Sequence, residues 1–235
     1  MPAVAGHFHL LHNLIHKATE ESLSLSALIL HYDLAPSAQY PTQLRQAVNA
    51  YKHLTEELKI SPSRILVAGD SAGGNLALAL LSHISRPSLQ VPVVEVAEPV
   101  AGAVLISPWV TFATDSPCMV ENRYKDCLDV VNLREWSSSY IGNAAEDNYT
   151  TPLRADANWW ASLKVNKLYV IAGGDELFAD DIARFADRIK AVLNNVEFFS
   201  SPGEAHDSPV LDFLLNAPDG GAARQFYKWT LEAAR

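Results

Sequence analysis

Residues 64–76 read RILVAGDSAGGNL, and this stretch decides how the rest of the chain is interpreted. An apolar run of strand type, 64–68, precedes Ser71, and a run of strong helix formers, 76–81, follows it. A G-x-S-x-G pattern between a strand and a helix places its serine on a sharp turn that exposes the hydroxyl. The stretch therefore predicts a nucleophilic serine at Ser71.

The neighbours of this serine have expected roles of their own. Gly69 and Gly73 have no side chain, and a larger residue at either position is expected to collide with the adjoining strand and helix. The helix after Ser71 points free N–H groups and the positive end of its dipole toward the reacting oxygen. We therefore expect the N–H of Ala72 to bind the oxyanion, with Gly73 in the same binding region. A bare G-x-S-x-G also occurs in plain glycine-rich turns, so the pattern needs partners elsewhere.

The composition limits the class of protein. The 235 residues are enough for one domain with a substantial core. The formal net charge of -9 argues against nucleic acid or an anionic membrane surface as partners, because phosphate binding needs clustered Lys and Arg. No run reaches the roughly 18 apolar residues of a membrane-spanning helix, and the first residues do not resemble a secretory signal. We expect a cytoplasmic protein.

Cysteines and histidines give no metal or disulfide framework. Cys118 and Cys127 are expected to be free thiols, although a bridge between them stays an alternative. His9, His12 and His16 have helical spacing that could hold a metal, but no carboxylate or cysteine joins them. We therefore expect neither a metal nor a cofactor.

Apolar segments of strand type alternate with amphipathic helical segments along most of the chain. This alternation indicates a mostly parallel sheet with helices on both faces, an α/β fold in a single domain over residues 1–235. Residues 112–163 lack a clear strand and are expected to form a lid or cap-like insertion, or a helical packing segment with buried aromatics. The expected strands are 27–31, 64–68, 101–106, 167–171 and 196–199, and the expected helices are 9–22, 41–58, 73–84, 180–194 and 222–234.

Ser71 needs a histidine base, because a serine hydroxyl is a weak nucleophile at neutral pH, and the base needs an orienting carboxylate. Asp175 follows the expected strand 167–171, and His206 follows the expected strand 196–199. Because the carboxyl ends of parallel strands meet at one edge of the sheet, both side chains should lie near the serine. The sequence thus predicts a catalytic set of Ser71, Asp175 and His206.

Other acids and histidines compete for these roles. Asp180 and Asp181 fall in the first turn of the next helix, where the helix dipole alone favours carboxylates. His83 lies at the far end of the helix after the serine, about 18 Å away at 1.5 Å per residue, which is too far for a base. His31 ends an expected strand and is interpreted as a packed or pocket-lining residue.

Over about residues 25–235 the chain resembles the hormone-sensitive-lipase branch of the α/β-hydrolases. That branch carries Tyr-x-Leu-Ala-Pro before its nucleophile elbow, the sharp turn that holds the serine. Residues 32–36 read Tyr-Asp-Leu-Ala-Pro here. Asp33 stands in place of the usual Arg, and Ser37 in place of the usual Glu. The resemblance implies an α/β-hydrolase fold and a serine esterase that needs no cofactor. The further matches are residues 69–75 and 107–109, Asp175 with Leu177, and Gly203 with His206.

The oxyanion hole is where the chain departs from this branch. Members carry His-Gly-Gly-Gly after an earlier strand, and its N–H groups complete the oxyanion hole. The motif would fall at or just before Met1 and is absent, as are the first strands of the fold. We expect a fragment, a shortened gene product or a natural loss. Losing one oxyanion donor costs roughly 100- to 1,000-fold in rate, and an exposed sheet edge favours association, including a homo-oligomer.

The resulting hypothesis is a serine hydrolase that cleaves short to medium acyl esters of small apolar molecules, such as a metabolite acetate, through an acyl-enzyme. One alternative is a catalytically impaired, receptor-like binder of small molecules, because the oxyanion motif is missing. Another is an amidase or acyltransferase that uses the same residues, which spacing does not distinguish from an esterase.

Overall fold

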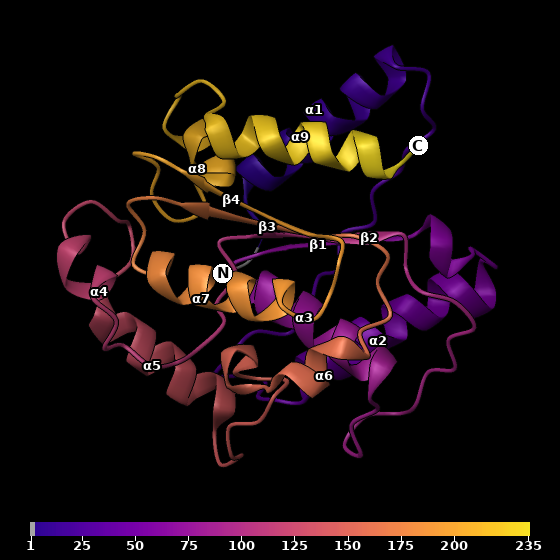
Figure 1. The fold of residues 1–235 in the computed structure, drawn as a ribbon, viewed down its shortest axis with the longest axis horizontal. Helices are drawn as coiled ribbons and strands as arrows, with labels where there is room; N and C mark the ends of the chain where they lie inside the picture. The colour runs from indigo at the N-terminus through magenta and orange to yellow at the C-terminus, as the bar shows by residue number, and fades with distance from the viewer. Residues whose placement is uncertain (1–2) are drawn as a thin grey trace.

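The computed structural model describes residues 3–235. At its centre lies a sheet of four parallel strands (Figure 1). In spatial order the strands are β1 (Leu66–Asp70), β2 (Gly102–Ile106), β3 (Leu168–Gly173) and β4 (Val196–Ser201). Asp70 pairs with Ile106, and Ile106 pairs with Ile171. The carboxyl ends of the strands therefore meet at one edge, where sites in such sheets are built.

Helices cover both faces of the sheet (Figure 1). α1 (Ala5–Glu20), α8 (Ser208–Leu214) and α9 (Gly221–Ala233) lie on one face, and α2 (Thr42–Lys52), α3 (Ala72–Ser85) and α7 (Ala179–Lys190) lie on the other. Successive residues of β2 enter opposite cores, with Ala103 and Leu105 on the α3 side and Val104 and Ile106 on the α1 side. The predicted α/β fold, with a parallel sheet covered on both faces, is confirmed.

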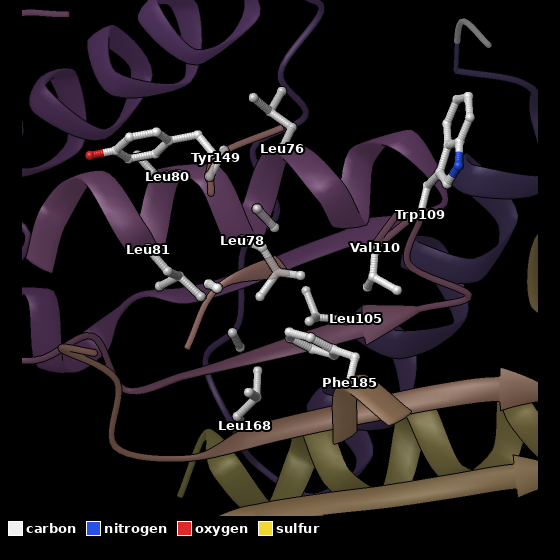
Figure 2. Packing of buried hydrophobic residues seen from close by; sticks show 14 of the residues in the cluster. Leu76, Leu78, Leu80, Leu81, Leu105, Trp109, Val110, Tyr149, Leu168 and Phe185 are labelled. Atoms are coloured by element: carbon white, nitrogen blue, oxygen red, sulfur yellow. The ribbon is translucent and has the colours of Figure 1, made fainter. Parts of the chain in front are cut away.

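The larger core lies between the sheet and the layer of α3 and α7 (Figure 2). Its central side chains are no more than 1% exposed: Leu78 and Leu81 of α3, Leu105 of β2, Leu168 of β3 and Phe185 of α7. Fully burying a side chain of this size contributes about 1.5–3 kcal/mol to folding. This packing fixes α3 on the sheet, and with it the turn that joins β1 to α3.

Residues 112–163 contain short helices and no strand. The helices are α4 (Cys118–Glu121), α5 (Val130–Ile141) and α6 (Ala157–Ala161), with a 3-10 turn over Pro152–Arg154. Trp160 of α6 is fully buried and packs edge-on against Phe185, with ring centroids 5.4 Å apart. α6 thus belongs to the core, as expected of a packing segment with buried aromatics. Cys118, which is buried, and Cys127, which is exposed, are both free thiols.

Three elements differ from the sequence-based expectation. Residues 27–31 are not a strand, and Leu28 and Ile29 are 54% and 41% exposed. The apolar run has no paired strand beside it in the described chain, and without ladder hydrogen bonds a β-prone segment gains little. The expected helix 41–58 ends as a regular helix at Lys52 and continues as a π-helical turn, His53–Glu57. α8 was not predicted.

Candidate active site

Ser71 occupies a strained turn between β1 and α3. Its backbone has φ 51° and ψ -117°, and non-glycine residues rarely adopt a positive φ. Its N–H donates to the carbonyl oxygen of Ile106 at 2.9 Å, and its own carbonyl accepts from the N–H groups of Trp109 and Asn75 at 3.0 and 3.1 Å. Such strain persists where the surroundings hold it in place. The sharp turn predicted from G-x-S-x-G is present.

The glycines of this turn differ in how closely other atoms approach them. A Cβ on Gly69 would lie 2.2 Å from the carbonyl oxygen of Gly73, and a Cβ on Gly74 would lie 2.9 Å from the Cβ of Pro108. A Cβ on Gly73 would meet only Asp70 Oδ1, at 3.7 Å. The steric need for glycine is therefore present at Gly69. At Gly73 the prediction is wrong, because the close approach falls one residue later, at Gly74.

His206 meets Ser71 as the sequence predicts. Its Nε2 lies 2.8 Å from Ser71 Oγ, which is within the distance that proton transfer requires. The histidine lies in the loop after β4 and is only 3% exposed. The ring of Phe178 packs edge-on against the imidazole, with ring centroids 5.1 Å apart. The buried imidazole thus has an aromatic ring packed against it and the serine hydroxyl at Nε2.

The carboxylate against this imidazole belongs to Glu176 and not to Asp175. Glu176 Oε2 lies 2.7 Å from His206 Nδ1, and Glu176 Oε1 accepts a hydrogen bond from the N–H of Gly173 at 2.9 Å. Glu176 is fully buried. Asp175 is partly exposed and lies 3.3 Å from Lys125 Nζ. The assignment of Asp175 as the acid is therefore wrong, and the structure places Glu176 in that position.

The turn after β3 explains why sequence reasoning missed Glu176. β3 continues to Gly173, two residues beyond the predicted end of this strand at residue 171. The N–H of Asp175 then donates to the carbonyl oxygen of Glu204 at 2.9 Å, which fixes the turn. Two adjacent acids after a strand point in different directions, and their residue types do not say which one points inward. The sequence indicated only that one of two adjacent acids, Asp175 or Glu176, could face the histidine.

Asp70, the residue before the serine, pairs with helix α1. His7 Nε2 lies 3.0 Å from Asp70 Oδ2, and His7 Nδ1 accepts a hydrogen bond from the N–H of Val4 at 3.0 Å. The bond to Asp70 raises the pKa of His7. Burial works to raise the pKa of Asp70, but His7 outweighs it and lowers that pKa. The pair ties α1 to the carboxyl end of β1, and nothing in the sequence indicated it.

A second carboxylate, Asp207, also contacts His206. Asp207 Oδ2 lies 3.2 Å from His206 Nε2, the nitrogen that faces Ser71. Asp207 is 3% exposed, has a left-handed backbone with φ 54°, and donates its N–H to Ser107 Oγ at 3.2 Å. Ser107 has a positive φ as well, 46°. Sequence reasoning missed Asp207, for which its place beside the histidine was the one signal.

Ala72 and Gly73 begin α3 directly after the serine. Within the described chain neither N–H has a hydrogen-bond acceptor, in keeping with their place in the first helical turn. Free N–H groups and the helix dipole favour negative charge at this point. Their position fits the predicted oxyanion donors, and the role itself stays a prediction.

Comparison with known proteins agrees with this geometry. A family model for the α/β hydrolase fold matches residues 3–209. The chain belongs to the α/β hydrolase fold family. An acetyl-hydrolase of Streptomyces hygroscopicus is 28% identical to this α/β hydrolase over 172 residues, which is 72% of this chain and 53% of the relative. The putative steryl acetyl hydrolase mug81 of Schizosaccharomyces pombe is 31% identical over 186 residues, 73% of this chain and 46% of the relative.

The fold matches solved structures of α/β hydrolases as well. An esterase from the bacterial hormone-sensitive lipase family superposes with a TM-score of 0.71 at 24% identity, covering 87% of this chain and 64% of that one. The resemblance to the hormone-sensitive-lipase branch is confirmed by the family match and by the sequence relatives, among them hormone-sensitive lipase of Mus musculus, which is 29% identical over 57% of this chain and 17% of the relative. The chain spans about half the length of the acetyl-hydrolase and steryl acetyl hydrolase relatives.

The other candidate residues of this α/β hydrolase have separate partners. Asp180 and Asp181 hydrogen-bond to the segment 116–118. His83 is fully buried away from the serine, and burial lowers its pKa. His31 is exposed, so it is not a packed residue, and the expectation that it lines a pocket stays a prediction. Residues 3–235 contain no group of three or more His, Cys, Asp or Glu side chains placed to hold a metal.

Asn75, in the first turn of α3, joins the elbow to the segments around it. Its buried Nδ2 donates to the carbonyl oxygens of Trp109 and Thr150, both at 2.8 Å. Asn75→Ala leaves both buried carbonyls without this donor, so we expect the free energy of unfolding to fall by about 1–3 kcal/mol. Urea unfolding measures the loss. The control Asn158→Ala, at an exposed position, should change it by less than about 0.5 kcal/mol, and equal losses would contradict the prediction.

Proposed function

We propose that this α/β hydrolase cleaves carboxylic esters, with Ser71 as nucleophile, His206 as base and Glu176 as the orienting acid. One observation carries the proposal. His206 links the serine to the acid through two short contacts. Its Nε2 lies 2.8 Å from Ser71 Oγ, and its Nδ1 lies 2.7 Å from Glu176 Oε2. The names of the relatives, acetyl-hydrolase and steryl acetyl hydrolase, support the same chemistry.

The reaction proceeds through an acyl-enzyme. Ser71 Oγ attacks the ester carbonyl while His206 Nε2 takes the serine proton, and Glu176 stabilises the imidazolium that forms. The tetrahedral intermediate collapses to acyl-Ser71, and His206 gives the proton to the departing alcohol. Water, deprotonated by His206, then attacks the acyl group, which releases the carboxylic acid and restores Ser71. These steps use side chains of the chain and water.

The oxyanion of both tetrahedral intermediates would bind at the N–H groups of Ala72 and Gly73. Their place at the start of α3 supports this role, because donors fixed in advance stabilise charge that develops in the transition state. One donor of this kind contributes roughly 100- to 1,000-fold in rate.

The proposed substrates are esters of small apolar molecules, with acetates foremost. Aromatic rings support this choice. Phe178 packs on the base, Trp109 stacks on Phe178 with ring centroids 5.8 Å apart, and Phe112 packs edge-on against Trp109 at 5.1 Å. Residues 112–163 supply Phe112 and stay the proposed lid. An amidase or acyltransferase would use the same three residues, and comparing p-nitroacetanilide with p-nitrophenyl acetate separates amide from ester cleavage.

A covalent serine probe tests the proposal. We expect a fluorophosphonate to label the chain stoichiometrically, with the mass shift at Ser71, and p-nitrophenyl acetate hydrolysis to fall in parallel with labelling. Ser71→Ala should take no label at this position. Ester hydrolysis that persists undiminished in Ser71→Ala contradicts the proposal. Binding of a small apolar ester without labelling or turnover would favour the receptor-like alternative.

Location and assembly are separate proposals. No helix within residues 3–235 has both the length and the apolar character that crossing a membrane demands. The cytoplasmic location rests on the two free thiols, which suit a reducing compartment. A homo-oligomer is proposed because β1 lies at the edge of the sheet in the described chain.

A further inference from the structure

Asp207 lies where it competes with the nucleophile for the base. Its Oδ2 is 3.2 Å from His206 Nε2, and Ser71 Oγ is 2.8 Å from the same nitrogen. The other oxygen, Asp207 Oδ1, is buried and has no hydrogen-bond partner within the described residues. The mechanism above uses Glu176 at Nδ1 and leaves Asp207 without a role. A buried carboxylate with an unpaired oxygen is costly, so its presence calls for an explanation.

The protonation state of His206 decides which neighbour Nε2 can serve. In the neutral base, Nδ1–H donates to Glu176 and the lone pair of Nε2 accepts the hydroxyl proton of Ser71. An ionised Asp207 then faces that lone pair, which is unfavourable because both atoms are acceptors. In the imidazolium, Nε2–H donates to Ser71 Oγ, and the positive ring lies against the Asp207 carboxylate, with 3.2 Å between Nε2 and Oδ2, so both contacts become favourable. The geometry therefore stabilises the protonated form, in which His206 does not accept a proton from Ser71.

We propose that Asp207 is a positioning residue that holds His206 as an imidazolium between two carboxylates, so that Ser71 is activated only in alkaline solution. The inference rests on the proposed function, because it concerns the base of that reaction. Asp207 then determines the pH range in which the site is active. It acts through His206 and does not touch the substrate.

The charges around the pair agree with this assignment. Burial works to lower the pKa of His206, but Asp207 and Glu176 outweigh it and hold that pKa well above the ordinary value. Burial also raises the pKa of Asp207. The other titratable groups near the pair are Asp126, Asp70 and Cys127. Asp126 Oδ1 accepts the backbone N–H of His206 at 3.0 Å, Asp70 pairs with His7, and Cys127 Sγ lies 3.8 Å from the carbonyl oxygen of His206. None of them replaces the contact of Asp207 at Nε2.

The backbone at residue 207 permits two informative substitutions. Its φ of 54° and ψ of 27° lie in the left-handed region, which asparagine tolerates and glycine adopts freely. Asp207→Asn therefore removes the charge with little change in shape, and Asp207→Gly removes the whole side chain. Asp212→Asn, in the helix α8 that follows Asp207, is the matched control, because burial raises the pKa of Asp212 too while it takes no part in the site.

The test is the pH profile of kcat/KM for p-nitrophenyl acetate in the unchanged protein and in these three variants. In Asp207→Asn and Asp207→Gly we expect the acid limb to move down by about one pH unit or more, because an opposite charge so close to His206 is lost. At a pH below both limbs, kcat/KM should rise about tenfold for each unit moved. The plateau at high pH should fall, since a less basic imidazole is a weaker proton acceptor. A merely structural role would lower activity equally at all pH values.

The pKa of His206, followed by NMR through its ring signals, gives a readout that does not depend on turnover. We expect it to fall in both Asp207 variants and to stay unchanged in Asp212→Asn. An unchanged His206 pKa in a folded Asp207→Asn or Asp207→Gly protein overturns the inference. A lowered pKa in proteins that neither react with the serine probe nor hydrolyse esters leaves the inference about the histidine standing and overturns the proposed function instead.

Discussion

Glu176→Gln is expected to lower kcat for acetyl esters by about 10,000-fold, the loss seen when the corresponding acid of a serine protease becomes an amide. The carboxylate accepts Nδ1–H of His206 at 2.7 Å and so leaves the Nε2 lone pair free for the proton of Ser71. A glutamine can present its N–H group to Nδ1, which favours the tautomer with the proton on Nε2 and blocks proton transfer. Steady-state kinetics near the plateau pH measures the loss.

The neighbouring acid provides the control for this prediction. Asp175→Asn removes a carboxylate one residue away that is partly exposed and lies 3.3 Å from Lys125 Nζ. An exposed ion pair of this kind contributes about 0–1 kcal/mol, so kcat should stay within a few fold of the unchanged protein. If Asp175→Asn lost most of the activity and Glu176→Gln kept it, the assignment of the acid would be reversed. Circular dichroism checks that both variants are folded.

Gly69→Ala should lower the free energy of unfolding by about 3 kcal/mol, at the upper end of the usual range for overpacking. The added Cβ would lie 2.2 Å from the carbonyl oxygen of Gly73, 2.5 Å from its carbonyl carbon and 2.8 Å from the nitrogen of Gly74. All three are backbone atoms, so relief requires α3 to move away from β1. Such a shift also displaces Ser71, and we expect ester hydrolysis to fall with stability.

Gly73→Ala is the matched control, four residues further along. Its Cβ would meet only Asp70 Oδ1, at 3.7 Å, which is an ordinary van der Waals contact. Because alanine favours a helix over glycine, we expect Gly73→Ala to be neutral or to stabilise the protein by up to about 1 kcal/mol. Urea unfolding of the two variants measures the contrast. Similar losses in both would show that the close approach at Gly69 does not carry the effect.

The parts of the fold that could be predicted are those in which local pattern and tertiary setting agree. β2 and β3 are continuous apolar runs buried on both faces, and α3 is a run of strong helix formers. The segment 27–31 has the same local pattern as a strand but lies without a paired strand in the described chain, so the pattern alone was not enough. α8 carries Pro209 in its first turn, a position that proline commonly takes at the start of a helix.

The site was predictable to the extent that sequence motifs fix geometry. Ser71 follows from the glycine-bounded turn, and His206 follows from its position after β4. Glu176 could not be separated from Asp175, because the direction of each side chain depends on how far β3 runs and on a hydrogen bond to the backbone of Glu204. The contact of Asp207 depends on a left-handed backbone, which residue type indicates only weakly.

Three residues with positive φ lie at the edge of the sheet where the carboxyl ends of the strands meet. They are Ser71, Ser107 and Asp207, with φ of 51°, 46° and 54°. Each such conformation costs of order 1–3 kcal/mol, and glycine would relieve it. Ser107 accepts the N–H of Asp207, and Asp207 contacts His206 in turn. A search for heat-resistant variants would therefore select glycine at positions 107 and 207. Each gain in heat resistance there would weaken the effect of Asp207 on the protonation of His206.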